Sequence, residues 1–328
     1  MTISPPHDDA ADRLSRRRFT RATAFALAAG LSSVDLASPA SAIGAGGRAY
    51  YDRARRLAGS DPVLLALATG MDPATPPGTS PPAPEPVKLF DNLALLSMGP
   101  VSAMAVLTRE GVVLIDALTA PEDAENVLVP GLRCVGARPE MVKYVVVTHG
   151  HFDHFGAAQY FADRYGARVL MSAADWGLLD RTRPANAPAR DLEITDGQRI
   201  TLGGTTLRFY HTPGHTAGTV SAILPVRAAR ERHMAMLWGG IRPPAAPGDL
   251  RTYLASIESF RVRMRQAGVD SELFNHPADY TLERVEQLHS RPGGPNPFIL
   301  GQWRTQHFMT VMALMVRGRI ADAEAPTT

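Results

Sequence analysis

Thr148–Gly156 reads THGHFDHFG and comes directly after the apolar run YVVV, Tyr144–Val147. A short continuous apolar run is typical of a buried strand, so this segment is expected to be the loop that leaves such a strand. Alternate side chains of an extended chain point the same way, so His149 and His151 can reach one ion. Beyond the turn, Asp153 and His154 can reach a second ion close to the first.

Two further segments offer histidines at the ends of predicted strands. His215 lies in HTPGHTAGT (His211–Thr219), and His276 lies in FNHPADY (Phe274–Tyr280). A lone histidine such as His276 is more often a satisfied core or surface residue than a metal ligand. The histidine loop together with TPGHT favours a metal site, because so many charge-capable groups would be costly to desolvate together. Imidazole nitrogen combined with carboxylate oxygen suits zinc, and also iron or manganese.

The first 42 residues are predicted to be a secretory signal rather than part of the fold. The basic stretch SRRRFT (Ser15–Thr20) precedes the apolar run ATAFALAAGL (Ala22–Leu31), and SPASA ends at Ala42. This order is that of a signal peptide, and its arginine pair resembles a twin-arginine signal. An amphipathic N-terminal helix is the alternative. The expected location is periplasmic or secreted, with the twin-arginine export machinery as a transient partner and no stable membrane anchor.

Composition gives no indication of a charged macromolecular partner. The 328 residues are 45% hydrophobic and carry a formal net charge of +2, which is ordinary for a globular protein and does not favour nucleic acid binding. A small-molecule substrate is therefore expected. The single cysteine, Cys134, cannot form an internal disulfide and is expected to be a core or near-core thiol.

The remainder of the chain divides into two parts. Residues 43–86 are predicted to contain a helical segment over 47–71, broken at Asp61–Pro62, and then a proline-rich linker over Asp72–Pro86. Residues 87–320 are predicted to form one domain of strands followed by mixed strands and helices. Two packed sheets with helices on their outer faces are the expected architecture. A methionine-rich apolar stretch, Phe308–Val316, is expected to be a core helix face.

Hydrophobic periodicity and turn residues predict the elements of this domain. The expected strands are Phe90–Met98, Ala103–Thr108, Val112–Asp116, Val142–Thr148, Arg168–Met171, Arg199–Leu202, Thr206–Tyr210, Thr219–Leu224 and His233–Trp238. The expected helices are Gly156–Tyr165, Ala173–Asp180, Asp249–Ala267, Tyr280–His289 and Pro297–Arg317.

THGHFDHFG followed by HTPGHTAGT resembles the metallo-β-lactamase fold superfamily. That resemblance implies an α/β fold of the αββα sandwich type, with two mixed β-sheets flanked by helices and the metals at one edge. It implies two Zn²⁺ ions, with iron or manganese left open. The first ion would be held by His149, His151 and His215, and the second by Asp153, His154 and His276. The segment VLIDA (Val113–Ala117) resembles the superfamily strand that ends in Asp, which implies that Asp116 steadies the metal loop without binding an ion.

One departure separates this chain from most hydrolases of the superfamily. They place a bridging Asp after a strand that corresponds to His233–Trp238, whereas MLWGGIRPP (Met236–Pro244) contains no carboxylate. The third subclass of metallo-β-lactamases lacks that bridge and uses the same histidine set, so the resemblance is greatest to that subclass. It implies a dinuclear metal-dependent hydrolase that attacks a cyclic amide with metal-bound hydroxide, and Asp153 would orient the water or accept its proton.

Alternatives remain open at this point. The protein could be a lactonase or esterase with the same ligands, or a non-catalytic periplasmic metal-binding protein. Ser221 is the candidate for holding a substrate carboxylate, with an ordinary strand residue as the alternative. His211 is expected to support the site or to be structural, with direct substrate contact as the minor possibility. Trp176 and Trp238 either line the cleft or belong to the core.

Overall fold

The computed structural model describes residues 45–76, 82–276, 279–291 and 293–325. The predicted signal, residues 1–42, lies outside the described residues, as does part of the predicted linker. Within the described residues, no helix combines the length and the apolar character needed to cross a membrane.

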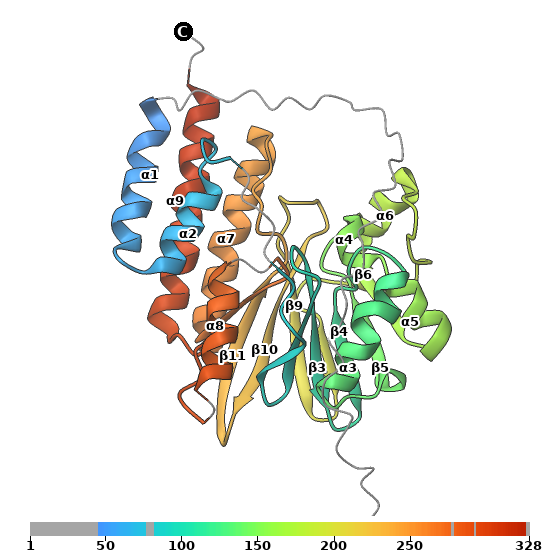
Figure 1. The fold of residues 1–328 in the computed structure, drawn as a ribbon. Helices are drawn as coiled ribbons and strands as arrows, with labels where there is room; N and C mark the ends of the chain where they lie inside the picture. The colour runs from blue at the N-terminus through green and yellow to red at the C-terminus, as the bar shows by residue number, and fades with distance from the viewer. Residues whose placement is uncertain (1–44, 77–81, 277–278, 292, 326–328) are drawn as a thin grey trace, which may run out of the picture. The chain divides into compact units, whose positions relative to one another are not determined.

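Twelve strands of the described part form two mixed sheets (Figure 1). The first sheet has the order β1-β2-β3-β4-β5-β6-β7; β1 to β4 are antiparallel and β4 to β7 are parallel. The second has the order β12-β11-β10-β9-β8, with only β11 and β12 parallel. The strands are β1 (Val87–Phe90), β2 (Leu93–Ser97), β3 (Ser102–Thr108), β4 (Gly111–Ile115), β5 (Val142–Val146), β6 (Arg168–Ser172), β7 (Leu192–Ile194), β8 (Arg199–Leu202), β9 (Thr205–His211), β10 (Val220–Ala228), β11 (Glu231–Trp238) and β12 (Ser271–Phe274).

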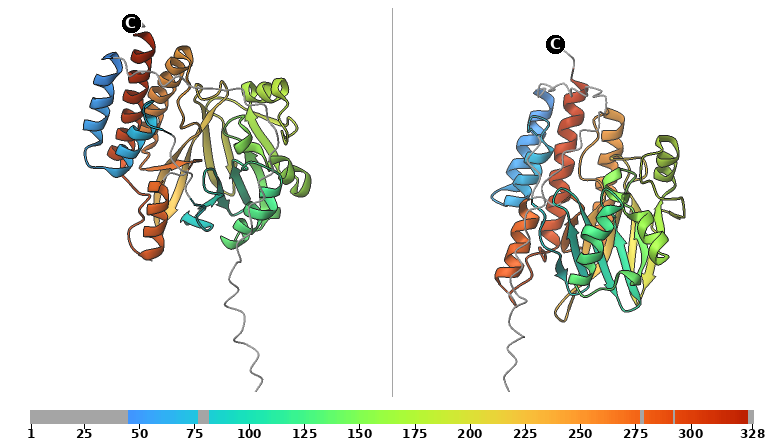
Figure 2. Two further views of the ribbon diagram at one scale, coloured as in Figure 1. Left: turned by 45° about the horizontal axis from the view of Figure 1, so that its top comes forward. Right: turned by 45° about the vertical axis from the view of Figure 1, so that its right-hand side comes forward.

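Helices cover the outer face of each sheet, and the two views of Figure 2 show them on opposite sides of the strands. The α-helices are α1 (Ala45–Ala58), α2 (Pro62–Met71), α3 (Val129–Cys134), α4 (Phe152–Phe155), α5 (Ala158–Tyr165), α6 (Ala173–Thr182), α7 (Pro247–Ala267), α8 (Asp279–Ser290) and α9 (Gln302–Glu324). A π-helical turn, Ala124–Leu128, precedes α3, and a 3-10 turn, Pro139–Met141, precedes β5.

Three clusters of buried apolar side chains correspond to these layers. One lies between the sheets and includes Val146, Phe209 and Leu237. A second joins the first sheet to α3, α5 and α6, and a third joins the second sheet to α1, α2, α7 and α9. Burying apolar area on both faces of each sheet is the main stabilising term of such a layered domain. The predicted αββα sandwich with two mixed sheets is confirmed.

The N-terminal helices pack against the last helix. Asp61 caps α2 by accepting hydrogen bonds from the amides of Val63 and Leu64, which explains the predicted break before Pro62. The Tyr51 hydroxyl on α1 donates to Asp322 on α9, with 2.6 Å between the oxygens. The apolar face of α9 is buried, including Met309, Met312 and Met315, so the prediction of a core helix face is confirmed.

Several predicted elements differ from the observed ones. The single strand predicted over Phe90–Met98 is two strands, because Asn92 makes a turn in which its side chain bonds Pro225 and Arg227 of β10. The helix predicted from Pro297 begins only at Gln302, since Gly301 has φ +85° and cannot continue a helix. Cys134 is exposed, so the prediction of a core or near-core thiol is wrong. Trp176 and Trp238 are buried core residues.

Candidate metal centre

The candidate ligands meet where strands of both sheets end. Parallel pairing of β4 with β5 brings Ile115 beside Val146, so Asp116 and the loop that begins at Thr148 lie at the same edge. In the second sheet, β9, β11 and β12 end at this edge, and the loops after β9 and β12 carry His215 and His276. The loop after β5 turns into the short helix α4, which carries Asp153 and His154.

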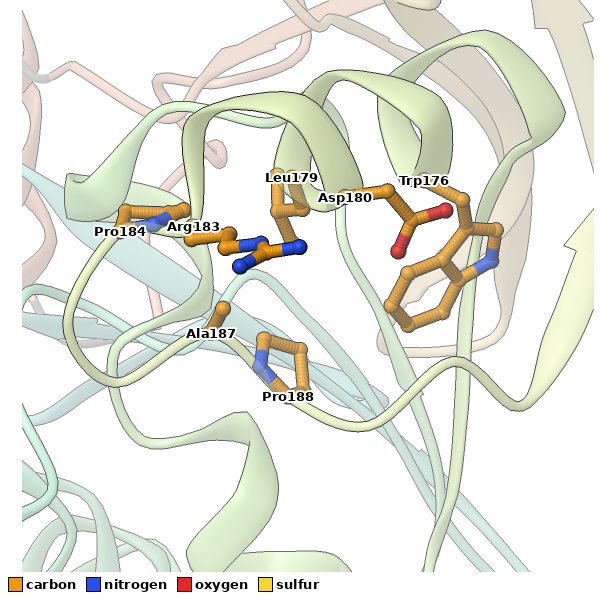
Figure 3. Close-up of a pocket in the computed structure, with 7 residues that line it drawn as sticks. All are labelled: Trp176, Leu179, Asp180, Arg183, Pro184, Ala187 and Pro188. Carbon is orange, nitrogen blue, oxygen red and sulfur yellow. The ribbon is translucent and has the colours of Figure 1, made fainter.

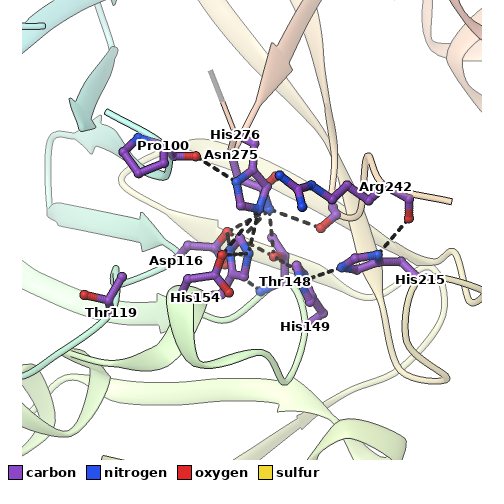
Figure 4. Close-up of polar contacts among 12 residues, drawn as sticks. Pro100, Asp116, Thr119, Thr148, His149, His154, His215, Arg242, Asn275 and His276 are labelled. Carbon is purple, nitrogen blue, oxygen red and sulfur yellow. Dashed lines mark hydrogen bonds and ion pairs between the residues drawn. The ribbon is translucent and has the colours of Figure 1, made fainter. Parts of the chain in front are cut away.

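The structure brings the six predicted ligands into two groups. Figure 4 shows four of them, His149 near His215 and His154 near His276. Within each group the candidate ligand atoms lie within 4.8 Å of one another. In the first group, Nε2 of His149 is 3.1 Å from Nε2 of His215. In the second group, Nε2 of His154 is 3.1 Å from Nε2 of His276, and Asp153 Oδ2 is 3.5 and 3.6 Å from these two atoms. The rings of His149 and His154, 4.0 Å apart between centroids, join the two groups. The groups are His149, His151 and His215, and Asp153, His154 and His276.

Hydrogen bonds at Nδ1 fix which nitrogen carries the proton in four of the candidate-ligand imidazoles. The carbonyl oxygens of Arg242 and Pro100 can only accept, so His215 and His276 donate from Nδ1, each over 2.8 Å. The carboxylate of Asp116 accepts from His154 Nδ1, also over 2.8 Å. The hydroxyl of Thr148 donates to Asp116 and can therefore only accept from His149 Nδ1. In neutral imidazoles, these bonds leave the inward Nε2 atoms with free lone pairs.

Two lone pairs 3.1 Å apart repel each other unless a proton or a metal cation lies near both. Burial, together with the neighbouring histidines, lowers the pKa of His149 well below its usual value. Burial also lowers the pKa of His215 to about 4, although its bond to the Arg242 carbonyl acts in the opposite direction. A shared proton is therefore disfavoured in this pair at neutral pH, and a cation fits the donor set.

The second group differs in its electrostatics. Burial would lower the pKa of His154, but the charge and hydrogen bond of Asp116 outweigh it, and the pKa is raised. Burial lowers the pKa of His276, the other histidine of this group, as it lowers that of His151 in the first group. A carboxylate behind a histidine orients the ring and raises its basicity, which is the arrangement found behind metal-binding histidines.

Asp116 accepts hydrogen bonds from several parts of this edge. Its Oδ1 accepts from the amide of Thr148 over 2.7 Å, and its Oδ2 accepts from the Thr148 hydroxyl and from Asn275 Nδ2, each over 3.0 Å. The backbone of Asp116 has φ +64°, unusual for a residue with a side chain. The loop after Asp116 lies against Gly156, where a Cβ atom would be 2.0 Å from the carbonyl carbon of Thr119.

Two buried residues at this edge, Asn275 and Asp175, were not predicted from the sequence as site residues. Asn275 precedes His276 and joins Asp116 to the carbonyl of Gly239, over 3.0 and 3.1 Å. Asp175 is on α6 and contacts the loops of both His149 and His215. Neither stands in a metal-ligand motif. The only sequence signal was position, because Asn275 follows β12 and Asp175 follows the capping residue Ser172.

Two candidates outside the ligand groups, His211 and Ser221, form hydrogen bonds to other parts of the protein. His211 Nε2 donates to the carbonyl of Ile194 over 3.0 Å, which favours a structural role. Ser221 is fully buried; its hydroxyl is 2.7 Å from Thr212 Oγ1 and accepts from the Gly239 amide over 3.1 Å. This geometry favours the alternative that Ser221 is a strand residue supporting the chain after β11.

The two glycines directly after β11 have no room for a side chain. A Cβ atom at Gly239 would be 1.9 Å from the carbonyl oxygen of Val220, and one at Gly240 would be 2.6 Å from Cβ of His215. Contacts this short do not occur in proteins, so neither position can carry a carboxylate on this backbone. In the described residues, the only carboxylate among the candidate ligands is Asp153.

A separate cavity of about 410 Å³ lies along α6 (Figure 3). It is lined by Trp176, Leu179, Asp180, Arg183, Pro184, Ala187 and Pro188. Leu179 also borders the metal loop, because a Cβ atom at Gly150 would be 2.9 Å from Leu179 Cδ1. The first turns of α6 thus form one wall behind the loop that carries His149 and His151.

Comparison with known proteins agrees with this fold. The family model of the Metallo-beta-lactamase superfamily matches residues 96–227. BJP-1, a subclass B3 metallo-beta-lactamase of Bradyrhizobium japonicum, has a TM-score of 0.60 and 23% identity over 71% of this chain and 90% of its own. FEZ-1, a metallo-beta-lactamase from Legionella gormanii, has a TM-score of 0.60 and 20% identity over 72% of this chain and 94% of its own. The chain has the metallo-β-lactamase fold, and the predicted resemblance to that superfamily is confirmed.

Curated relatives match over shorter stretches. A hydroxyacylglutathione hydrolase of Acidiphilium cryptum (strain JF-5) is 37% identical over 98 residues, which are 30% of this chain and 37% of the relative. A hydroxyacylglutathione hydrolase of Pseudomonas aeruginosa (strain LESB58) is 36% identical over 81 residues, 25% of this chain and 28% of the relative. The match thus spans about a third of the length of these relatives.

Proposed function

We propose that this protein is a dinuclear metal-dependent hydrolase. The observation that carries the proposal is the pair of imidazole contacts, His149 with His215 and His154 with His276, whose inward nitrogens are positioned for a cation. Zinc is the proposed metal, because imidazole and carboxylate ligands suit it. His149, His151 and His215 would hold one ion, and Asp153, His154 and His276 would hold the other.

The cations would supply two kinds of chemistry when bound: they acidify a water molecule and polarise a carbonyl group. The residues of the chain then have distinct tasks. The carbonyls of Arg242 and Pro100 and the Asp116 carboxylate hold three imidazoles in the tautomer that presents Nε2 inward. Asp153 orients the attacking water or accepts its proton while contributing a ligand oxygen to the second group.

A cyclic amide of the β-lactam kind is the proposed substrate. The support is the donor set of six residues without a bridging carboxylate, together with the steric closure at Gly239 and Gly240. A lactone or other ester is the second candidate. It is favoured by the curated relatives that carry the name hydroxyacylglutathione hydrolase.

The test is turnover by the mature, zinc-loaded protein beginning at Ile43. A carbapenem, a cephalosporin and a simple lactone are offered side by side, each with and without a chelator. Chelator-sensitive opening of the β-lactams supports the first candidate, and turnover of the lactone alone supports the second. Absence of turnover with all three substrates, in protein shown to hold two metal ions, would favour the non-catalytic periplasmic metal-binding protein.

Export to the periplasm or beyond is part of the same proposal. Residues 1–42 would direct the chain to the twin-arginine machinery, which then is a transient partner. The test is a fusion of these residues to a reporter that is active only after export. Replacement of the arginine pair by lysines (Arg16→Lys with Arg17→Lys) should abolish the exported signal, and unchanged export would exclude this route.

A further inference from the structure

A buried carboxylate lies behind the first ligand group, on a different helix from any candidate ligand. Asp175 is fully buried in the first turn of α6, which begins at the carboxyl end of β6. The side chain of Ser172 caps this helix and accepts the amide of Asp175 over 3.3 Å. The backbone of Asp175 is thus fixed by the start of the helix, and its side chain extends toward the ligand loops.

Three hydrogen-bond donors converge on this carboxylate. The amide of Gly150 and the hydroxyl of Thr216 donate to Oδ2 over 2.8 and 2.7 Å, and the amide of Gly218 donates to Oδ1 over 3.0 Å. Gly150 stands between His149 and His151, and Thr216 follows His215. One side chain therefore joins the two loops that supply all three members of the first group.

The approach of both loops to Asp175 is close, and at Gly218 it requires glycine. A Cβ atom at Gly150 would be 3.3 Å from Asp175 Cβ, and one at Gly218 would be 2.6 Å from Asp175 Cγ. Both positions are glycine, and each donates its amide to the carboxylate. The spacing of the loops is therefore set by direct contact with Asp175.

The charge of Asp175 is not balanced by a basic side chain. No ion pair between described residues joins Asp175 to lysine or arginine. A buried carboxylate is costly unless hydrogen-bond donors and nearby positive charge compensate for it. The second ligand group contains Asp153 and contacts Asp116, whereas the first consists of three imidazoles alone. Asp175 supplies a negative charge that is in direct contact with both loops of the first group.

We propose that Asp175 is a positioning residue for the first metal: it holds the loops of His149, His151 and His215 at the separation the ion needs and supplies compensating charge behind them. This inference rests on the proposed function, because it presupposes a metal. Groups that orient metal ligands from behind typically change metal affinity about 10–100-fold when they are removed. Asp175→Asn removes the charge and places an amide group against the converging donors, so it should weaken the first site by that factor.

The experiment measures metal affinity rather than turnover. In a His276→Ala background, which disables the second group, Co²⁺ binding is followed by its absorption spectrum and by competition with a chromophoric chelator. Asp123→Asn is the matched control, because Asp123 Oδ2 also accepts two amides and a threonine hydroxyl, from Thr119 and Ala120, but touches neither ligand loop. Unfolding of the metal-free proteins is measured in parallel.

For Asp175→Asn we expect a roughly 10–100-fold larger dissociation constant and an altered Co²⁺ spectrum. For Asp123→Asn both the dissociation constant and the spectrum should be unchanged. Equal affinities for Asp175→Asn and its parent would overturn the inference and leave the proposed function standing. Absence of Co²⁺ binding by the wild-type chain would instead overturn the proposed function. If Asp175→Asn does not fold, the positioning role is tested with Thr216→Val instead. This variant keeps the carboxylate but removes one of its hydrogen-bond donors. A several-fold loss of affinity is then expected, and no loss refutes the positioning role.

Discussion

At the scale of single residues, the candidate metal centre depends on side chains that bind protein atoms as much as on those that would bind an ion. Asp116 has a left-handed backbone conformation that costs about 1–3 kcal/mol. It is held there by bonds to Thr148, His154 and Asn275, so the strain is compensated by the contacts that orient the ligand loop. Strain of this kind is concentrated at functional sites.

Asp153 provides the residue-scale prediction. Asp153→Asn keeps the shape of the side chain but cannot accept a proton, whereas the first group contains no atom of this residue. Turnover should fall by about 10²–10⁴-fold, the usual range for a lost acid–base group, with occupancy of the first site nearly unchanged. Metal content and steady-state kinetics measured on one preparation check this. Retained turnover would exclude the proposed role of Asp153.

Local sequence signals account for what could be predicted at this scale. The six candidate ligands and Asp116 were predicted because they stand in short motifs at strand ends. Asp175 and Asn275 were not, since their partners Gly150 and Asp116 are distant in sequence and meet them only in the folded chain. Burial of the Ser221 hydroxyl likewise depends on the path of the Gly239 backbone.

At the scale of secondary structure elements, a buried charge cluster joins the N-terminal helices to the second sheet. Arg304 on α9 pairs with Asp61, the cap of α2, and its Nη2 lies 3.4 Å from Glu272 Oε1 on β12. Arg284 on α8 lies 3.7 Å from the same oxygen. Periodicity alone predicted most of these elements, but it could not show that the helices before the proline-rich segment share this cluster with the last strand.

Glu272 makes the stability of this junction depend on pH. Burial raises the pKa of Glu272 to about 7, although Arg304 and Arg284 act in the opposite direction. Between the ordinary glutamate pKa of 4.5 and about 7 the folded protein retains a proton that the unfolded chain releases, so the contribution of Glu272 to stability falls as pH rises through this window. The full change is on the order of 3 kcal/mol.

Glu272→Gln should therefore gain stability relative to the wild type as pH rises from 5 to 8. Denaturant unfolding of both proteins across this range measures the difference, and effects of pH on the metal centre cancel because both proteins share them. Glu258→Gln is the matched control, because Glu258 forms an exposed pair with Arg317 that is expected to contribute little. A pH-independent difference between wild type and Glu272→Gln would show that Glu272 does not titrate in this window.

At the scale of the whole described unit, the candidate centre lies at the seam between the two sheets. The amide of Ser102 on β3 donates to the carbonyl of Asn275, and the amide of Val220 on β10 donates to the carbonyl of Thr148, each over 2.8 Å. The proposed ligands also come from both sheets: the loop after β5 supplies four of them, and the loops after β9 and β12 supply His215 and His276. A metal held here would connect the two sheets and stabilise their packing.

This arrangement predicts that metal and stability are linked. A ligand that binds only the folded state at a free concentration about 1,000 times its dissociation constant adds about 4 kcal/mol of stability, which for a domain of this size is roughly 7 °C in Tm. Chelation should lower Tm by that amount, and added zinc should restore it. His215→Ala combined with His276→Ala removes both links to the second sheet and should abolish most of the dependence, whereas His289→Ala, at an exposed position on α8, should leave it unchanged. If Tm changes with neither chelator nor zinc, or if Tm responds equally to them in both variants, then no metal joins the sheets at this edge. The imidazole pairs would then have to be held together by the protein alone.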